Sequence, residues 1–226
     1  MSRFTRTLLC LAALLVSVAA APLSSMAASI IYSDLNSDPA NVYSSGVGYT
    51  VSGSSTQLGL VISALPFTPG ANYDLSQIDV ALGYVSGTNS FMLSLVNDNG
   101  GRPGTTVLDS WTVSTTANLG TCCALDTVTP NGTDVLLGGV QYWLVAAPGA
   151  ADSWAGWNWN TTGARGTVAQ STDGISWGLF PNTTLGAFDV LGNSVTATPE
   201  PSTAKLLGTA LAAMLVLVHF GSRRSS

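Results

Sequence analysis

The sequence predicts an all-β domain, an antiparallel β-sandwich or jelly roll, with a signal peptide before it and a membrane helix after it. Two strongly apolar runs, 8–20 and 206–220, lie near the ends of the chain, and the region between them is rich in Gly, Ser, Thr and Asn. These residues favour turns and strands over helices. No segment before residue 203 has helical periodicity. Many short strands without alternating helices favour packed antiparallel sheets.

The N-terminus has the order of a signal peptide. Two arginines within the first six residues precede the apolar run 8–20, and small residues follow it. This order is typical of exported proteins. Ser25 and Ala27 occupy the two positions that a signal peptidase reads, so we expect cleavage after Ala27 and a signal peptide over residues 1–27. Cleavage after Ala21 fits the same pattern, although a proline would follow the cut, and a retained membrane helix is the alternative reading.

The region 28–193 has the length of one domain. Residues 77–84 alternate between apolar and polar side chains, and residues 91–95 repeat the pattern. Such alternation indicates strands with one buried face. Because Gly87-Thr88-Asn89 separates the two runs, they are predicted to form a hairpin.

Further strands follow along the domain. A dense turn signal over 97–104 precedes a strand at 107–113. The more continuously apolar runs 135–137 and 140–147 predict central strands, with two glycines between them as a bulge or bend. Shorter runs predict three more strands, at 154–159, 167–171 and 185–191.

The charge of the domain excludes one class of partner. Arg102 and Arg165 are the only basic residues in region 28–193, against eleven aspartates and no glutamate, a net charge of minus nine. Such a surface repels polyphosphates. We therefore expect no nucleic-acid binding and no binding of anionic lipids through a basic patch.

The C-terminal segment has three parts in a fixed order. Pro199-Glu200-Pro201 precedes the apolar run 206–220, and Arg223-Arg224 stands almost at the end. The prolines block helix formation and keep the triplet extended, as the cleft of a processing enzyme requires. The apolar run reaches about 22 Å against about 30 Å of hydrocarbon, a short span. The two arginines fix the C-terminus inside by the positive-inside rule.

This triplet, apolar helix and basic pair resemble the PEP-CTERM sorting signal. The resemblance implies a substrate of exosortase, a membrane-embedded enzyme that cleaves near the triplet and is associated with exopolysaccharide production in Gram-negative bacteria. It divides the C-terminus into a linker (194–205), a transmembrane helix (206–222) and a basic cytoplasmic tail (223–226). The implied location is the inner membrane before processing, and then the cell surface or extracellular matrix. An ordinary anchor that is never processed is the alternative.

The domain itself resembles the choice-of-anchor domains of PEP-CTERM proteins, especially the type called R. The features that carry this resemblance are the turn 98–104, the strand start at 107–108, and the segments 139–143 and 154–160. It covers about residues 31–191. These are turn and core residues, so the resemblance speaks for the fold, and the family has no assigned catalysis to carry over.

The chemistry available to the domain is narrow. The only histidine, His219, lies in the predicted anchor helix, so the domain has no imidazole for a catalytic triad or a zinc site. The aspartates supply carboxylates for a glycosidase, but none lies in a local signature, and turns explain their abundance better. Asp98 and Asn99 beside two glycines offer oxygens that suit calcium, but they lack the spacing of an EF-hand loop, so a hairpin turn is the expected role. We expect no cofactor and no metal.

Two further features are candidates for function. Cys122 and Cys123 are adjacent, and free thiols, a vicinal bridge and a cross-link to another chain all remain open, with the vicinal bridge slightly favoured by export. Trp154, Trp157 and Trp159 form an aromatic segment that suits a sugar-binding face, although large aromatics more often fill a sandwich core.

From these observations we expect a non-catalytic exported protein with a structural or interaction role at the cell envelope or in the exopolysaccharide matrix. Signal peptidase and exosortase are its expected processing enzymes, and exopolysaccharide is a candidate partner. The first alternative is a carbohydrate-binding module that uses the three tryptophans. A secreted glycan hydrolase is the more distant alternative, and it would need two carboxylates that converge in one pocket at glycosidase spacing.

Overall fold

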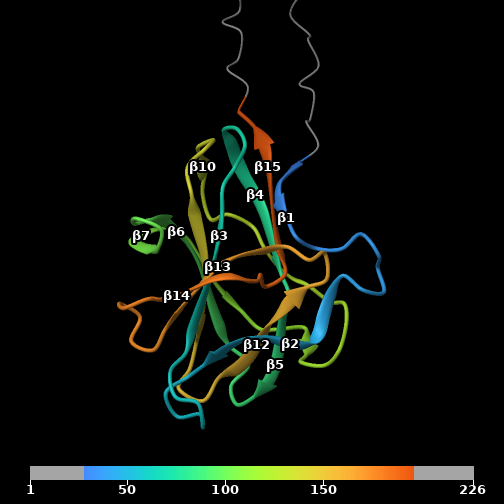
Figure 1. The fold of residues 1–226 in the computed structure, drawn as a ribbon, viewed down its shortest axis with the longest axis vertical. Helices are drawn as coiled ribbons and strands as arrows, with labels where there is room; N and C mark the ends of the chain where they lie inside the picture. Colours follow the sequence, from blue (N-terminus) through green and yellow to red (C-terminus); the bar gives the residue numbers. More distant parts are fainter. Residues whose placement is uncertain (1–27, 196–226) are drawn as a thin grey trace, which may run out of the picture.

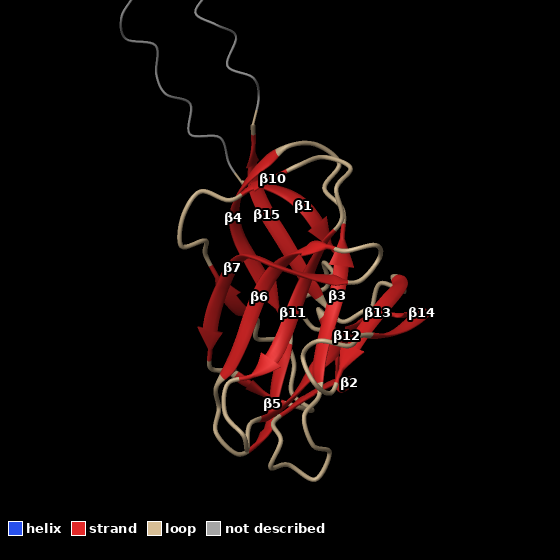
Figure 2. Cartoon of the chain, turned by 90° about the vertical axis from the view of Figure 1, so that its left-hand side faces the viewer, coloured by secondary structure: helices blue, strands red, loops and turns tan. Residues whose placement is uncertain are grey.

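The computed structural model describes residues 28–195, and in this part of the chain every regular element is a strand (Figures 1 and 2). The predicted all-β class is confirmed. The predictions for residues 1–27 and 196–226, which include the signal peptide, the Pro-Glu-Pro triplet, the membrane helix and the basic tail, lie outside the described residues. Within residues 28–195 there is no helix long and apolar enough to cross a membrane. The strands are β1 (Ser29–Ser33), β2 (Tyr43–Ser52), β3 (Ile62–Phe67), β4 (Tyr73–Val80), β5 (Leu82–Ser86), β6 (Phe91–Asp98), β7 (Pro103–Val113), β8 (Ala117–Asn118), β9 (Asp126–Val128), β10 (Val135–Leu136), β11 (Tyr142–Pro148), β12 (Trp154–Asn160), β13 (Arg165–Ser171), β14 (Gly178–Thr184) and β15 (Phe188–Ser194).

The largest sheet has six strands in the order β14-β13-β3-β11-β6-β7, and every neighbouring pair is antiparallel. Figure 2 shows these strands side by side across one face of the molecule. A second sheet has the order β1-β15-β4, with β9 and β10 both paired to the far edge of β4. The third sheet has the order β2-β12-β5-β8, and β5 with β8 is its one parallel pair.

The second and third sheets continue one another where β4 runs into β5 at Ala81. The Ala81 N–H donates to the carbonyl of Ala187 at 3.1 Å, and the Ala187 N–H donates to that of Asn158 at 2.7 Å. Asn158 donates to the Ala81 carbonyl with both its backbone N–H, at 2.9 Å, and its side-chain Nδ2, at 3.0 Å. The two sheets are therefore joined by a hydrogen-bonded bend and face the six-stranded sheet together.

The core lies between these two faces. Leu65, Leu93 and Leu144 from the six-stranded sheet and Ile78 and Val190 from the opposite sheets are all fully buried in one cluster. Burial of each such side chain contributes about 1.5–3 kcal/mol. Aromatic rings fill the middle of the cluster: Phe188 is stacked on Tyr32 and meets Phe67 and Trp157 edge-on. This packing is consistent with a β-sandwich.

The apolar residues that alternate along the sequence are those whose side chains are buried in the structure. In β6 the side chains of Phe91, Leu93 and Leu95 have no exposed surface, whereas Met92 between them is 46 % exposed. The dense turn signal after it is the connection between β6 and β7, which pair as a hairpin. Gly100 and Gly101 both have positive φ, at 65° and 81°, which explains why two glycines stand there.

The predicted hairpin of 77–84 with 91–95 is wrong. Strand β5 pairs with β12 and β8, while β6 pairs with β11 and β7 in the opposite layer. The segment 87–89 crosses between the layers instead, and distant residues hold it there. The Ser153 hydroxyl donates to the Thr88 carbonyl at 2.7 Å, and Asn89 donates to the Thr115 carbonyl at 3.0 Å. Both crossing segments and tight hairpins use Gly and Asn, so the turn residues did not distinguish them.

One of the two predicted central strands is also wrong. Strand β10 has only two residues and pairs with the edge of β4, and the neighbouring side chains of Val135 and Leu137 are 44 % and 48 % exposed. The other, β11, is confirmed as central because it pairs with β3 on one side and β6 on the other. A short apolar run can therefore cover the end of a sheet as well as fill its centre.

Candidate functional site

The aromatic segment 154–159 forms strand β12, but it does not form the three-tryptophan face that its sequence predicted. Trp157 has no exposed surface. Its indole Nε1 donates to the Ala187 carbonyl at 3.1 Å, and its ring meets Phe188 edge-on. Trp157 is thus a core residue, and the sugar-binding role predicted for it is corrected. The physical reason is that the position faces the opposite layer, where a large apolar ring gains most from burial.

Trp154 and Trp159 remain together at the outer surface of this sheet. Both are half-buried, and they line a hollow of about 330 Å³ with Val47, Val85 and Leu119. The register of β2 shifts opposite Asn158 and Trp159, which breaks strict alternation at that point. We call this site the Trp154 hollow; no charged side chain is among its lining residues.

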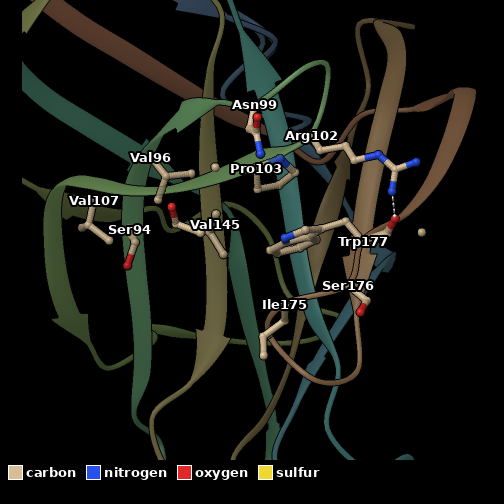
Figure 3. Close-up of a pocket in the computed structure, with 14 residues that line it drawn as sticks. Ser94, Val96, Asn99, Arg102, Pro103, Val107, Val145, Ile175, Ser176 and Trp177 are labelled. Atoms are coloured by element: carbon tan, nitrogen blue, oxygen red, sulfur yellow. Dashed lines mark hydrogen bonds between the residues drawn. The ribbon is translucent and has the colours of Figure 1, made fainter.

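A larger hollow of about 750 Å³ lies on the outer face of the six-stranded sheet (Figure 3). Two connections form its walls: the β6–β7 turn, which supplies Asn99 and Arg102, and the segment between β13 and β14, which supplies Ile175 and Trp177. Figure 3 shows the Trp177 indole lying between Pro103 and Ile175, with the Arg102 side chain extending past it. We call this site the Trp177 groove.

The floor of the Trp177 groove is a second apolar cluster, separate from the main core. Trp143 is fully buried there with Val96, and Val145 and Trp177 pack against them. Arg102 ties the two walls together, because its Nη1 donates to the Trp177 carbonyl at 3.0 Å. The indole is therefore held at a fixed place over the sheet.

Asp98 braces the β6–β7 wall of the groove. Its Oδ1 accepts hydrogen bonds from Trp143 Nε1 at 2.7 Å and from Gln141 Nε2 at 2.8 Å, and its Oδ2 accepts one from the Gly101 N–H at 3.0 Å. A charged acceptor makes stronger hydrogen bonds than a neutral one. Asp98 therefore serves as a structural hydrogen-bond acceptor. Its position is explained by these three hydrogen bonds without a role as a calcium ligand.

Asp173 braces the other wall. Its Oδ1 accepts hydrogen bonds from the backbone N–H groups of Ile175 and Ser176 at 2.8 and 2.7 Å, and the Ser171 hydroxyl donates to it at 2.9 Å. These hydrogen bonds to the charged form, those from Ile175 and Ser176 first, hold the pKa of Asp173 well below its usual range. Ile175 is 84 % exposed at the tip of this connection.

Two pairs of neighbouring carboxyl groups lie away from both hollows. Asp79 and Asp189 are directly opposite each other in the register of β4 and β15. Burial, and then the charge of Asp79, raises the pKa of Asp189 to about 7. Gln77 Nε2 donates to Asp79 at 2.6 Å, and the Thr127 hydroxyl donates to its other oxygen.

Asp34 lies near this pair at the start of the domain. Its Oδ1 accepts the Phe188 N–H at 2.8 Å, and its Oδ2 accepts the Tyr32 hydroxyl at 3.2 Å. Burial raises the pKa of Asp34 to about 7, although these hydrogen bonds act in the opposite direction. Burial and the nearby Asp34 carboxylate also raise the pKa of Tyr32.

Asp109 and Asp134 are the second pair of neighbouring carboxyl groups. Burial and the charge of Asp109 raise the pKa of Asp134, while Asp109 accepts the Asn131 N–H at 2.8 Å and Asn131 Nδ2 at 2.6 Å. Two glycosidase carboxyls stand about 5 Å or more apart so that a sugar fits between them. Neither this pair nor Asp79 with Asp189 lines the Trp154 hollow or the Trp177 groove.

Cys122 and Cys123 are joined as a vicinal disulfide. Cys123 packs on a third small cluster with Tyr43 and Leu125, outside the bend at Ala81. The Tyr43 hydroxyl donates to the carbonyls of Thr121 at 3.3 Å and Ala124 at 3.0 Å on either side of the cysteines. The disulfide therefore belongs to a loop that closes the outer surface. In residues 28–195 no three His, Cys, Asp or Glu side chains are placed to hold a metal ion.

Sequence reasoning missed the Trp177 groove, although it held two signals for it. Arg102 is one of only two basic residues in the domain, and Trp177 is a tryptophan outside any alternating run, just after an Asp-Gly turn. The two lie far apart in the chain, and only the sheet order brings their connections together.

The chain matches no protein-family model, no curated protein and no solved structure.

Proposed function

We propose that this chain is an exported protein that is held at the cell envelope by its C-terminal tail and released or re-anchored there by a sorting protease. The observation that carries the proposal is the position of the domain's two ends. Ser29 in β1 pairs with Gly192 in β15, so the chain enters and leaves the domain side by side. Figure 1 shows this at one end of the molecule, with β2, β5 and β12 at the other.

This arrangement suits a domain tethered by its tail. The segment with Pro199-Glu200-Pro201, the apolar run 206–220 and Arg223-Arg224 follows β15 directly. We propose that it works as a PEP-CTERM signal, with signal peptidase acting at the N-terminus and exosortase acting near the triplet. The end of the domain that carries the Trp154 hollow then points away from the membrane, toward the polysaccharide of the matrix.

The fold that we propose for this role is an antiparallel β-sandwich. Its one layer is the six-stranded sheet, and its other layer is the pair of sheets joined at Ala81. A sandwich of this size has a core that holds without a ligand, so it suits export as a structural or interaction module.

Comparison of cells with and without exosortase tests the sorting proposal. An immunoblot against the domain is expected to show a shorter chain in the cell-surface or matrix fraction of wild-type cells. In cells without exosortase the longer chain is expected in the inner membrane. The triplet variant Pro199→Ala/Glu200→Ala/Pro201→Ala should behave like the wild-type chain in exosortase-deficient cells. An unchanged mass and location in both backgrounds contradicts processing.

We propose that the domain is not itself an enzyme. The support is the placement of its carboxyl groups: neither the Trp154 hollow nor the Trp177 groove has an acidic side chain among its lining residues, and a third hollow of about 770 Å³ beside Trp111 has one, Asp126. The pairs Asp79 with Asp189 and Asp109 with Asp134 line none of these three hollows, whereas glycoside hydrolysis requires two carboxyls that flank the sugar. A secreted hydrolase therefore stays the most distant alternative.

A carbohydrate-binding module is the second candidate function, and the Trp154 hollow favours it. Two half-buried indoles with apolar neighbours and no charge offer flat faces for neutral sugar rings. The test is a glycan array probed with the wild-type chain and with the double variant Trp154→Ala/Trp159→Ala. Loss of binding in the double variant supports the assignment, whereas binding that survives the double substitution removes it.

A further inference from the structure

The Trp177 groove combines an aromatic face with the positive charge of Arg102, whereas no charged side chain lines the Trp154 hollow. We propose that the Trp177 groove binds a carboxylated sugar unit of a polysaccharide, with the sugar ring against the Trp177 indole and its carboxylate on the Arg102 guanidinium. This inference goes beyond envelope sorting and beyond neutral sugar binding at the Trp154 hollow, and it stands on separate residues.

The groove has the size and lining of a ligand site. Its volume of about 750 Å³ falls within the range of about 300–1,000 Å³ that is usual for small-molecule pockets. Apolar side chains form much of its surface, with Val96 and Val145 on the floor and Ile175 on one wall. A pyranose ring presents C–H groups on its faces, and such groups pack well on an indole.

Polar side chains that can hydrogen-bond a sugar also line the groove. The Asn99 amide and the hydroxyl-bearing side chains of Ser94, Thr105 and Ser176 also line the groove. An amide side chain and a hydroxyl can each donate and accept hydrogen bonds, so these groups match the hydroxyls of a sugar ring. A few polar groups in a mainly apolar pocket are what gives such a site its specificity.

The charge of Arg102 sets the class of sugar. In residues 28–195 the structure pairs its guanidinium with a neutral backbone carbonyl, that of Trp177, and with no carboxylate. That hydrogen bond uses Nη1, whereas a guanidinium has five N–H donors. The other donors are available for a carboxylate, which a guanidinium binds through two parallel hydrogen bonds.

The two carboxylates that brace the walls of the groove, Asp98 and Asp173, do not compete for Arg102. Asp98 accepts three hydrogen bonds from Trp143, Gln141 and Gly101, and Asp173 accepts those of its own turn. Neither lines the groove. The same hydrogen bonds fix both walls in advance, which lowers the entropy cost of binding.

The single cation also limits the groove to one carboxylate of the ligand. The domain around it carries a net charge of minus nine, so a densely charged polyphosphate is repelled. A polysaccharide with one carboxylate per sugar can place one charge on Arg102 and leave its neighbours in solvent. An acidic peptide carries carboxylates too, but it has no ring of hydroxyls and C–H faces for the indole.

Isothermal titration calorimetry of the full chain in detergent micelles tests the proposal with four probes. The first is an oligogalacturonate, and the second is the same oligomer with its carboxyls reduced to alcohols. A sulfated oligogalactan and oligoglutamate are the third and fourth. We expect the oligogalacturonate to bind and the reduced oligomer to bind at least tenfold more weakly, since charge-assisted hydrogen bonds to Arg102 are lost.

Two substitutions locate the site. Arg102→Gln is expected to weaken oligogalacturonate binding at least tenfold and to weaken binding of the reduced oligomer much less, because the reduced oligomer is affected only by loss of the hydrogen bond to the Trp177 carbonyl. Arg165→Gln, which removes the same charge elsewhere in the domain, is the matched control and should change binding less than twofold. Trp177→Ala should weaken binding of both oligomers, while Trp177→Phe keeps a flat ring and should retain most of the binding.

Each part of the proposal is contradicted by a different result. Equal loss from Arg102→Gln and Arg165→Gln, or equal binding of the acidic and the reduced oligomer, overturns the role of Arg102. Equal or tighter binding of the sulfated oligomer contradicts the preference for a carboxylate. Equal binding of oligoglutamate contradicts the preference for a sugar ring. Absence of binding by the oligogalacturonate overturns the proposal as a whole, and it leaves the sorting of the chain untouched, because exosortase dependence is measured separately.

Discussion

The Trp154 hollow and the Trp177 groove, two of the hollows on the outside of the domain, are built from different kinds of structure. The Trp154 hollow rests on hydrogen-bonded strands, and aromatic and aliphatic side chains line it without a charge. The Trp177 groove lies between two connections that end strands of the opposite layer, and one of them supplies Arg102. The difference teaches that in this domain the strands provide flat apolar surface, whereas the connections provide charge and hydrogen-bonding groups.

The same contrast separates tryptophans that stabilise from a tryptophan that is available to a ligand. Trp157 is fully buried between the layers, while Trp177 is only partly buried at the edge of the groove. Trp157→Ala is therefore expected to lower the free energy of unfolding by about 3–5 kcal/mol, since it leaves a cavity in the core. Trp177→Ala is expected to lower the free energy of unfolding by clearly less. Urea denaturation followed by circular dichroism measures both.

Equal losses of free energy of unfolding in Trp157→Ala and Trp177→Ala would contradict this contrast between the two tryptophans. A Trp157→Ala domain that unfolds within 1 kcal/mol of the wild type would show that this ring is not part of the core. Trp157→Phe is the conservative companion, because it keeps an aromatic ring against Phe188 and should recover part of the loss.

The layer opposite the groove should be sensitive to pH near neutrality. Burial raises the pKa of Asp34 and of Asp189 to about 7, whereas an unfolded aspartate titrates near 3.9. Between these values the folded state holds protons that the unfolded state releases. The stability contributed by protonation is complete below about pH 4, falls as pH rises, and is lost above about pH 7. We expect the free energy of unfolding to fall from pH 5 to pH 8 by about 2–3 kcal/mol for Asp34, and by less for Asp189 because its side chain is partly exposed to water.

The groove should not contribute to that pH dependence. The pKa of Asp173 lies below its usual range, so its carboxylate stays charged from pH 5 to pH 8 and its stabilisation changes only in stronger acid. Asp34→Asn and Asp189→Asn are expected to flatten the profile, and Asp173→Asn is the matched control that should leave its slope intact. A wild-type stability that rises between pH 5 and pH 8 would contradict the assignment.

The smallest of the expected stability effects lies in the groove itself. Asp98→Ala removes the acceptor of three hydrogen bonds and leaves the buried Trp143 Nε1 without its partner. We expect a loss of about 1–2 kcal/mol by thermal unfolding, with Asp98→Asn costing less because it keeps an acceptor oxygen. Loss of the brace should also weaken oligogalacturonate binding, since the β6–β7 wall is no longer fixed. Unchanged stability in both variants would show that the turn holds without Asp98.

Local patterns in the sequence predicted the strands better than their pairing. The alternation of 91–95 and the glycine-rich turn after it both correspond to the structure, since each depends on neighbouring residues. The pairing of 77–84 was predicted wrongly, because the partner of β5 is β12, far along the chain. Strands β2, β3 and β14 lacked a pattern clear enough to place them. β2 mixes glycine and serine with its apolar residues, and β14 contains a proline at an edge of its sheet.

The candidate sites show the same difference between local patterns, which the sequence predicts, and long-range contacts, which it does not. The segment 154–159 was recognisable as aromatic, but its sequence did not show which ring faces the core, because that depends on the opposite layer and on the register shift in β2. The Trp177 groove depends on residues 75 positions apart, Arg102 and Trp177. Sequence composition indicates that such residues are rare in this domain, and only the sheet order indicates that they meet.

The central claim, an exported chain sorted by its tail, is tested most directly by the termini of the protein recovered from cells. Mass spectrometry of the chain purified from the surface or matrix fraction is expected to find an N-terminus at Ala28 and a C-terminus near Pro199–Pro201. A soluble cytoplasmic chain that retains every residue from Met1 to Ser226 would contradict it.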